Sequence, residues 1–153
     1  MTRPDRRSIL AGGAGLLAVT LVRPARAAER PPREPTLSAI RRFAGDALIR
    51  PGRVSLDLPP LVENGNAVPL SVAVESPMTE ADHVRRIAVF NDKNPQPNVL
   101  TIHLSPRAGR AAVSTRIRLA DSQTVTAIAE MSDGSYWSAT ADAIVTLAAC
   151  VEG

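Results

Sequence analysis

The 153-residue sequence is poor in side chains that bind metals or stack on nucleic acid. It contains one cysteine, two histidines, one Trp, one Tyr and two Phe. Neither a C-x-x-C nor an H-x-x-x-H pattern occurs, so we expect no dedicated transition-metal site. With so few aromatic rings there is little on which bases could stack, and we expect no nucleic-acid partner.

The basic charge of the chain is concentrated at its N-terminal end. The whole sequence has a formal net charge of +3 and a pI near 10.0, values that alone would favour an anionic partner. Residues 1–27 hold five of the 18 basic side chains and only one acid. The remaining residues carry 13 basic and 14 acidic side chains, a balance that argues against electrostatic binding of nucleic acid.

Motifs of enzymes and of cofactor-binding proteins are also lacking. The only closely spaced glycines, Gly12, Gly13 and Gly15, lie in the N-terminal apolar run, and no G-x-S-x-G or paired-carboxylate arrangement occurs. We therefore predict a protein that is not an enzyme, with no catalytic residues and no cofactor.

Residues 1–27 have the order of an export signal. Arg6 and Arg7 precede an apolar run, residues 10–22, and Ala25-Arg26-Ala27 supplies small residues for cleavage. The run is too short for a transmembrane helix, which needs about 20 apolar residues. The paired arginines favour the twin-arginine route, with a chance Arg-Arg pair in a general secretory signal as the alternative. We predict cleavage after Ala27 and a periplasmic protein that does not contact the membrane afterwards.

The chain after residue 27 is short enough for one domain. Residues 28–50 are interpreted as a Pro-rich linker followed by an amphipathic helix, which starts at Thr36 and ends before Pro51. Over residues 51–147 the apolar period changes to two, which is typical of strands. The expected strands are Arg53–Leu58, Ala67–Val74, Arg85–Asn91, Val99–Leu104, Ala112–Leu119, Thr124–Met131 and Tyr136–Leu147.

Turn-forming pairs such as Asn64-Gly65 and Asp133-Gly134 separate these runs. Seven short strands at this spacing predict an all-β, immunoglobulin-like sandwich, with a barrel as the alternative. Alternation places Arg116 and Arg118 on the outward face of one strand, where we interpret them as solvated rather than as an anion site.

His103 alternates with Ile102 and Leu104, so we expect it to point away from the core. A surface position and a catalytic base are the two interpretations of this residue. The other histidine, His83, has no further ligand at metal-binding spacing.

Cys150 is the residue that we expect to carry the function. In an oxidising compartment a lone cysteine is either buried and inert or kept free for chemistry between molecules. Its position near the end of the chain favours the second use, because chain ends are seldom buried. We expect the run Ile144–Ala149 to pair as a final strand that then releases the last residues, and we assign residues 148–153 to an arm that presents the thiol.

Several segments resemble the SoxY family of periplasmic sulfur-oxidation carriers. They are Ser71–Ser76, Asp82-His83 with Ile87–Asn91, Asn94-Pro95-Gln96-Pro97, Thr115–Ala120 with Ser122-Gln123, and Met131-Ser132-Asp133-Gly134. The resemblance implies an immunoglobulin-like sandwich and a heterodimer with a SoxZ-like subunit that has no signal of its own. It also implies a cysteine, here Cys150, that holds thiosulfate-derived sulfur while a c-type cytochrome and a sulfur-hydrolysing enzyme act on it.

The cysteine-bearing segment departs from the usual pattern of that family, Gly-Gly-Cys-Gly-Gly. Here it reads Ala148-Ala149-Cys150-Val151-Glu152, which resembles a subgroup with an Ala-Ala-Cys-Ile/Val-Glu type arm. Alanine lacks the ready access of glycine to positive φ, so we expect a stiffer arm than the family's usual one. The carrier role is predicted, whereas the sulfur cargo is left open.

Two other functions use the same cysteine. Cys150 with His103 as its base would make a thiol transferase. Cys150 in an intermolecular disulfide would make a binding or assembly module. A partner is expected in any case, because the twin-arginine route exports cargo that is already folded and the sequence offers no cofactor site.

Overall fold

A computed structural model of the chain describes residues 33–149. The predicted signal with Arg6 and Arg7, most of the linker, and Cys150 lie outside the described residues. The described part begins with the helix α1 (Glu34–Ala44). Nine strands and one short 3₁₀ helix follow within residues 33–149: β1 (Ile49–Pro51), β2 (Val54–Asp57), β3 (Leu61–Val62), β4 (Val68–Val74), β5 (Val84–Asn91), β6 (Asn98–His103), η1 (Pro106–Ala108), β7 (Ala112–Ile117), β8 (Gln123–Met131) and β9 (Tyr136–Val145).

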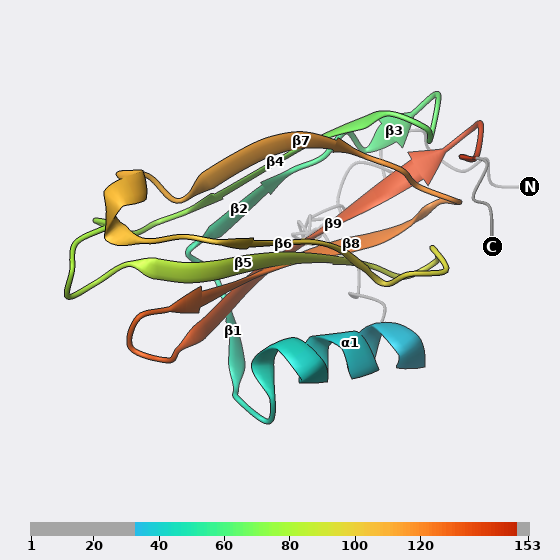
Figure 1. The fold of residues 1–153 in the computed structure, drawn as a ribbon. Coiled ribbons are helices and arrows are strands. Elements are labelled where there is room, and N and C mark those ends of the chain that lie inside the picture. The colour runs from blue at the N-terminus through green and yellow to red at the C-terminus, as the bar shows by residue number, and fades with distance from the viewer. Residues whose placement is uncertain (1–32, 150–153) are drawn as a thin grey trace, which may run out of the picture.

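The strands form two sheets that pack face to face (Figure 1). The larger sheet has the order β1-β9-β8-β5-β6, and β3 also pairs with β9. The smaller sheet has the order β2-β4-β7. All seven predicted strands are present, as β2 and β4 to β9, so the predicted all-β sandwich is confirmed.

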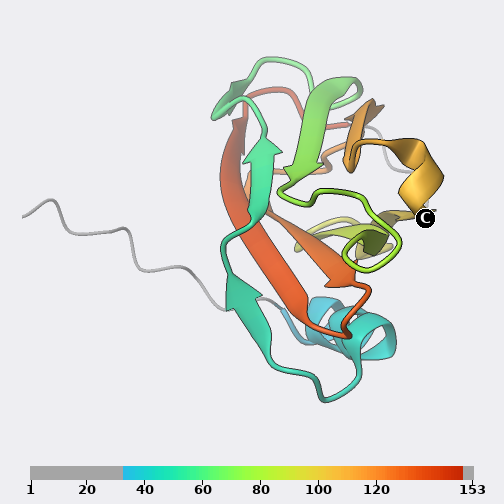
Figure 2. The same cartoon turned by 90° about the vertical axis from the view of Figure 1, so that its left-hand side faces the viewer.

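The short strands β1 and β3 were not predicted. Both pair in parallel with β9, with Ile49 opposite Tyr136 and Leu61 opposite Ile144, whereas β2 between them pairs antiparallel with β4 in the other sheet. The chain therefore crosses from the larger sheet at β1 to the smaller sheet at β2 and returns to β9 at β3, along one side of the sandwich (Figure 2). Strands of two or three residues are too short to show a period, which is why the pattern missed them.

The helix is shorter than predicted. It ends at Ala44, and Gly45 follows with φ +63° and an N–H that donates to the Arg41 carbonyl at 2.7 Å. Glycine adopts a positive φ at a helix end readily, because it lacks the Cβ that disfavours this geometry. The predicted helix end before Pro51 is thus wrong, and residues 49–51 belong to the sheet.

The main core lies between the two sheets, where alternate residues of β4, Val68, Leu70 and Val72, are buried. Helix α1 covers the other face of the larger sheet (Figure 1). There Phe43 packs edge-on against Phe90 and Tyr136, with ring centroids 5.9 and 6.0 Å away. Within residues 33–149, no helix has the length and apolar character needed to cross a membrane.

Candidate functional site

The chain beyond β9 stays attached to the sandwich up to the residue before the cysteine. Thr146 N–H donates to the Val62 carbonyl at 2.9 Å, and Gly65 N–H donates to the Leu147 carbonyl at 2.8 Å. Two further bonds extend this ladder: Leu119 N–H donates to the Gly65 carbonyl at 2.8 Å, and Ala149 N–H donates to the Leu119 carbonyl at 3.0 Å. We call these four backbone hydrogen bonds the C-terminal anchor.

The anchor corrects the predicted start of the arm. The arm was assigned to residues 148–153, but Ala149 is bonded and only 6% exposed. This agrees with the expectation that the run Ile144–Ala149 pairs with the sandwich, although β9 itself ends at Val145. Ala149 therefore belongs to the bonded part of the chain. The anchor thus attaches the chain to the body of the domain up to Ala149, the last described residue.

Gly65 allows the bonded segments of the anchor to lie close together. A Cβ placed on it would lie 2.3 Å from the Leu119 carbonyl oxygen and 2.8 Å from the Ala149 nitrogen. Side chains do not tolerate such distances, so any other residue would push the two bonded segments apart. Its φ is not positive, and the need for glycine here is one of space. The sequence identified Asn64-Gly65 as a turn but did not reveal this contact.

Asn94 holds the segment that presents the Leu119 carbonyl. Its Nδ2 donates to the Arg118 carbonyl at 2.8 Å, and its Oδ1 accepts from Ala120 N–H at 3.0 Å. Gln123 Nε2 also donates to Asn94 Oδ1, at 2.9 Å. These residues belong to two of the segments on which the family resemblance rested, and their role is to clamp residues 118–120 from both sides.

A charge pair lies next to this clamp. Lys93 N–H donates to Gln123 Oε1 at 2.8 Å, and Lys93 Nζ lies 3.1 Å from Asp121 Oδ2. The hydrogen bond from Lys93 lowers the pKa of the Asp121 carboxyl below its usual value. Both side chains are exposed, so the pair orders the surface more than it stabilises the fold.

His103 is exposed at the end of β6, as predicted, and it lies far from the anchor. It is opposite Arg86 on β5, which in turn is opposite Glu130 near the end of β8. The anchor lies beyond Gln123, at the start of β8. A strand rises about 3.3 Å per residue, so the two sites are on the order of 20 Å apart. The structure therefore does not bring His103 near Ala149, the residue that precedes Cys150.

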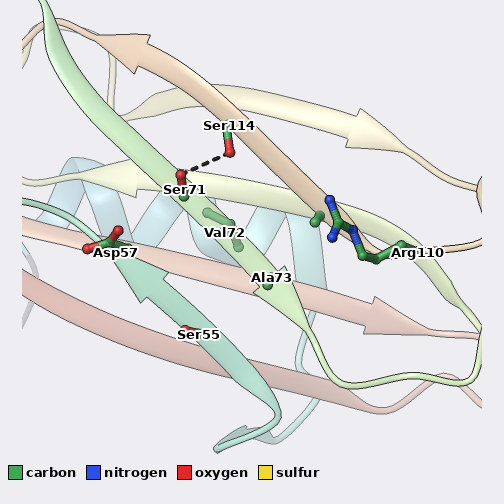
Figure 3. A pocket seen from close by; sticks show the side chains of 8 residues that line it. Ser55, Asp57, Ser71, Val72, Ala73, Arg110 and Ser114 are labelled. Carbon is green, nitrogen blue, oxygen red and sulfur yellow. Dashed lines mark hydrogen bonds between the residues drawn. The ribbon is translucent and has the colours of Figure 1, made fainter.

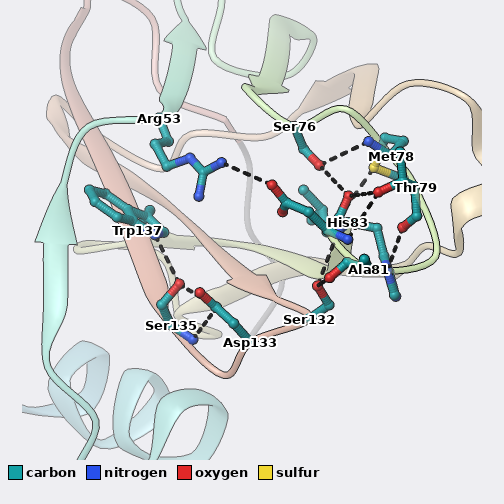
Figure 4. A network of polar contacts seen from close by, with 12 residues as sticks. Arg53, Ser76, Met78, Thr79, Ala81, His83, Ser132, Asp133, Ser135 and Trp137 are labelled. Atoms are coloured by element: carbon teal, nitrogen blue, oxygen red, sulfur yellow. Dashed lines mark hydrogen bonds and ion pairs between the residues drawn. The ribbon is translucent and has the colours of Figure 1, made fainter.

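His83 lies in a network of loop residues at the opposite end of the sandwich from the anchor (Figure 4). Its backbone N–H donates to Ser132 Oγ at 3.1 Å, and its Nδ1 lies 3.0 Å from the Thr79 carbonyl. Buried Met78, 5% exposed, accepts the Val84 N–H through its sulfur at 3.4 Å. We call these contacts the far-end network. In this network His83 joins the loop before β5 to the loop after β8.

The outward face of the smaller sheet carries an open hollow of about 230 Å³ (Figure 3). Hydroxyl groups dominate it, with Ser71 Oγ and Ser114 Oγ 2.9 Å apart. Arg116 and Arg118 are exposed, in agreement with their predicted solvated role, and neither lines the hollow. Among the residues that the structure describes, no group of three or more His, Cys, Asp or Glu side chains is placed to hold a metal ion.

Comparison with protein families matches residues 40–150 to the family described as "Sulfur oxidation protein SoxY". Among solved structures, the sulfur carrier protein SoxY from Chlorobium limicola f thiosulfatophilum is similar to the chain, with a TM-score of 0.61 and 26% identity over 72% of this chain and 94% of that one. No curated protein sequence matches the chain.

Superoxide reductases share the fold. The enzyme (neelaredoxin) from Ignicoccus hospitalis has a TM-score of 0.55 and 18% identity over 61% of this chain and 80% of that one. A putative superoxide reductase from Thermotoga maritima has a TM-score of 0.55 and 21% identity over 63% of this chain and 93% of that one. At this identity the likeness concerns the sandwich and not the activity.

Proposed function

The chain belongs to the SoxY family of sulfur oxidation proteins, and we propose on this premise that it carries a sulfur intermediate covalently on Cys150. The family match extends to residue 150. The similar structure from Chlorobium limicola is that of a sulfur carrier protein. We further propose that the cargo derives from thiosulfate-type compounds.

The C-terminal anchor is the observation that supports this proposal most strongly. A carrier must offer its thiol to more than one enzyme in a reproducible place. Backbone bonds that reach Ala149 hold the chain in place up to the residue before Cys150, the only cysteine of the sequence. This geometry suits a thiol that other proteins approach.

The chemistry that such a carrier supports is simple to balance. A Cys150 thiolate and thiosulfate form a sulfur–sulfur bond with loss of two electrons, which a c-type cytochrome accepts. Water then cleaves the bond to the terminal sulfonate in a second enzyme, which releases sulfate and two protons and leaves a persulfide on Cys150. The product remains exchangeable with thiols, so reductant removes it.

We also propose that the protein acts in the periplasm as a heterodimer with a SoxZ-like β-sandwich subunit. Residues 1–27, with Arg6 and Arg7, support export by the twin-arginine route of a complex already folded in the cytoplasm. Changing both arginines to lysine should leave the precursor in the cytoplasm, because lysine does not present the paired planar guanidinium groups. Normal processing of this variant would contradict the route.

The test of the carrier role is a Cys150→Ser strain. We expect it to lose the sulfur adduct and the oxidation of the sulfur compound, while the protein still folds and keeps its partner subunit. Ala148→Ser is the matched control, because it introduces the same side chain two residues earlier at an exposed position. Unimpaired oxidation in the Cys150→Ser strain would contradict the carrier role. A disulfide-linked species on non-reducing electrophoresis, without any sulfur adduct, would favour the assembly module instead.

A further inference from the structure

Exposed apolar side chains gather beside the C-terminal anchor. Leu61, Ile144 and Leu147 are 60%, 62% and 61% exposed. Leu61 and Ile144 are direct partners in the pairing of β3 with β9, so their side chains stand on the same face of the sheet. The Leu147 carbonyl belongs to the anchor itself. We call these three residues the apolar patch.

These three residues differ from the isolated apolar side chains of an ordinary protein surface. Single exposed apolar residues are common, whereas neighbouring ones mark interaction sites. Within residues 33–149 only one other large apolar side chain is similarly exposed, Leu48 at 73%. Leu48 precedes β1, which pairs with the start of β9, and it therefore lies at the opposite end of that strand from the patch.

The anchor limits where a partner must go to reach the thiol. Ala149 is buried and bonded, and one peptide bond connects it to Cys150. The anchor therefore fixes the position of the last described residue before the cysteine. A protein that reacts with this thiol has to approach the surface around Ala149, and Leu147 of the apolar patch lies two residues before it in the anchor.

Two carboxylates flank the patch. Asp142 is exposed and lies two residues before Ile144, on the same face of β9. Glu63 is exposed two residues after Leu61. An enzyme that handles sulfur oxyanions needs cationic groups around its active site to attract and hold them. Its entrance would complement this surface, with apolar contacts to the patch and basic groups opposite Asp142 and Glu63.

We propose that the apolar patch is the docking surface for the enzyme that transfers sulfur to Cys150. This inference rests on the proposed carrier function. A permanent subunit or a second copy of the chain on the same surface would cover the surroundings of the thiol and block the enzymes that must reach it. Three exposed side chains are also suited to a transient contact, since permanent interfaces are larger and more apolar.

The test compares three variants of the full chain in its native cells. Leu61→Gln with Ile144→Thr makes the patch polar with strand-compatible side chains. Leu61→Val with Ile144→Val keeps it apolar, and Leu48→Gln makes the same kind of change away from the anchor. After a thiosulfate pulse, intact-mass measurements give the rate at which Cys150 gains its adduct. We expect about a tenfold slower rate in the polar variant, as for loss of interface contacts of this kind, and less than about twofold change in the other two.

The outcomes separate this inference from the function on which it rests. Equal loading of the polar variant and the wild type would overturn the docking surface and leave the carrier function standing. A wild-type Cys150 that never gains sulfur would overturn both. Loss of the co-purified subunit, or a changed oligomeric state, in the polar variant would assign the patch to that occupant and overturn the inference. A slower reaction of Cys150 with iodoacetamide in the polar variant would also overturn the inference, because the substitutions would then have altered the thiol itself.

Discussion

The C-terminal anchor and the far-end network differ in how much they depend on side chains. At the cysteine end the C-terminal anchor consists of backbone hydrogen bonds between residues 62–65, Leu119 and residues 146–149. At the other end Ser132 N–H also donates to the His83 carbonyl at 2.8 Å, but the far-end network adds bonds to the side chains of Met78, His83 and Ser132 (Figure 4). A backbone bond does not depend on the identity of the residue that makes it, whereas a side-chain bond does.

The use of backbone groups explains how the segment before Cys150 can consist of Ala148 and Ala149 without glycine. Ala149 donates through its backbone, and Ala148 is exposed. Only Gly65 is restricted, because a Cβ there meets the bonded neighbours. The anchor therefore allows the arm sequence to vary while the position of the chain before Cys150 is kept.

The largest expected effect comes from the far end, with Met78→Ala. This change removes a buried side chain and the sulfur that accepts the Val84 N–H. We expect the free energy of unfolding to fall by about 2–4 kcal/mol, as for other buried Met→Ala changes. Urea denaturation measures it. Alkylation of Cys150 by iodoacetamide should keep its rate, and a changed rate would show that the two ends are coupled.

Gly65→Ala should open the C-terminal anchor. Its new Cβ would push Leu119 away from Ala149, and we expect a loss of about 1–3 kcal/mol in the free energy of unfolding. Hydrogen exchange of the Ala149 amide should also become faster. Gly109→Ala is the control, because nothing lies within 4 Å of its Cβ and only its positive φ is disfavoured. Unchanged exchange at Ala149 in Gly65→Ala would refute the anchor.

Ala149→Gly should have a smaller effect, because the anchor uses the backbone of this residue. We expect a loss of about 1 kcal/mol from the missing buried methyl group and the added freedom of the unfolded chain. Ala148→Gly, at an exposed position, serves as the comparison and should lose less. If Ala149→Gly opened the anchor as far as Gly65→Ala, the position would depend on the side chain after all.

The smallest effect is a pH dependence at the far end. The hydroxyl and the N–H of Ser135 donate to the Asp133 carboxylate at 2.7 and 2.9 Å, and these bonds lower the pKa of Asp133. Their contribution is present above the unfolded-state pKa of about 3.9 and is lost as the pH falls through the lower folded-state pKa. The difference in the free energy of unfolding between wild type and Asp133→Asn should therefore shrink from pH 6 to pH 2. A constant difference would contradict this role of the ionised carboxylate.

The sequence was sufficient to predict the longer secondary-structure elements, whose apolar residues follow a recognisable pattern. The strands from β4 to β9 are six or more residues long and lie between turn-forming residues, so their existence could be predicted. The helix end could not, because Ala47 and Leu48 continue the helical spacing past Gly45. The charge pair and the clamp around Asn94 join residues that are about 25 to 30 positions apart, and no local pattern reports such a contact.

The site was predicted less completely than the fold. Cys150 was selected by its rarity and its position, and its role stays a prediction because it lies outside the described residues. The anchor had no counterpart in the sequence, since bonds between backbone groups do not select side chains. Gly65 was the one residue whose type is required by the anchor, but a turn at Asn64-Gly65 explained that glycine equally well.

The central claim is that Cys150 carries sulfur while the chain before it stays bonded to the sandwich. Peptide-level mass spectrometry of the native protein, taken from cells oxidising thiosulfate, tests this most directly. The account predicts a sulfur-containing adduct on the peptide that contains Cys150 and on no other, removed by reductant. An unmodified Cys150 thiol under every growth condition, or an adduct that resists reductant, would contradict it.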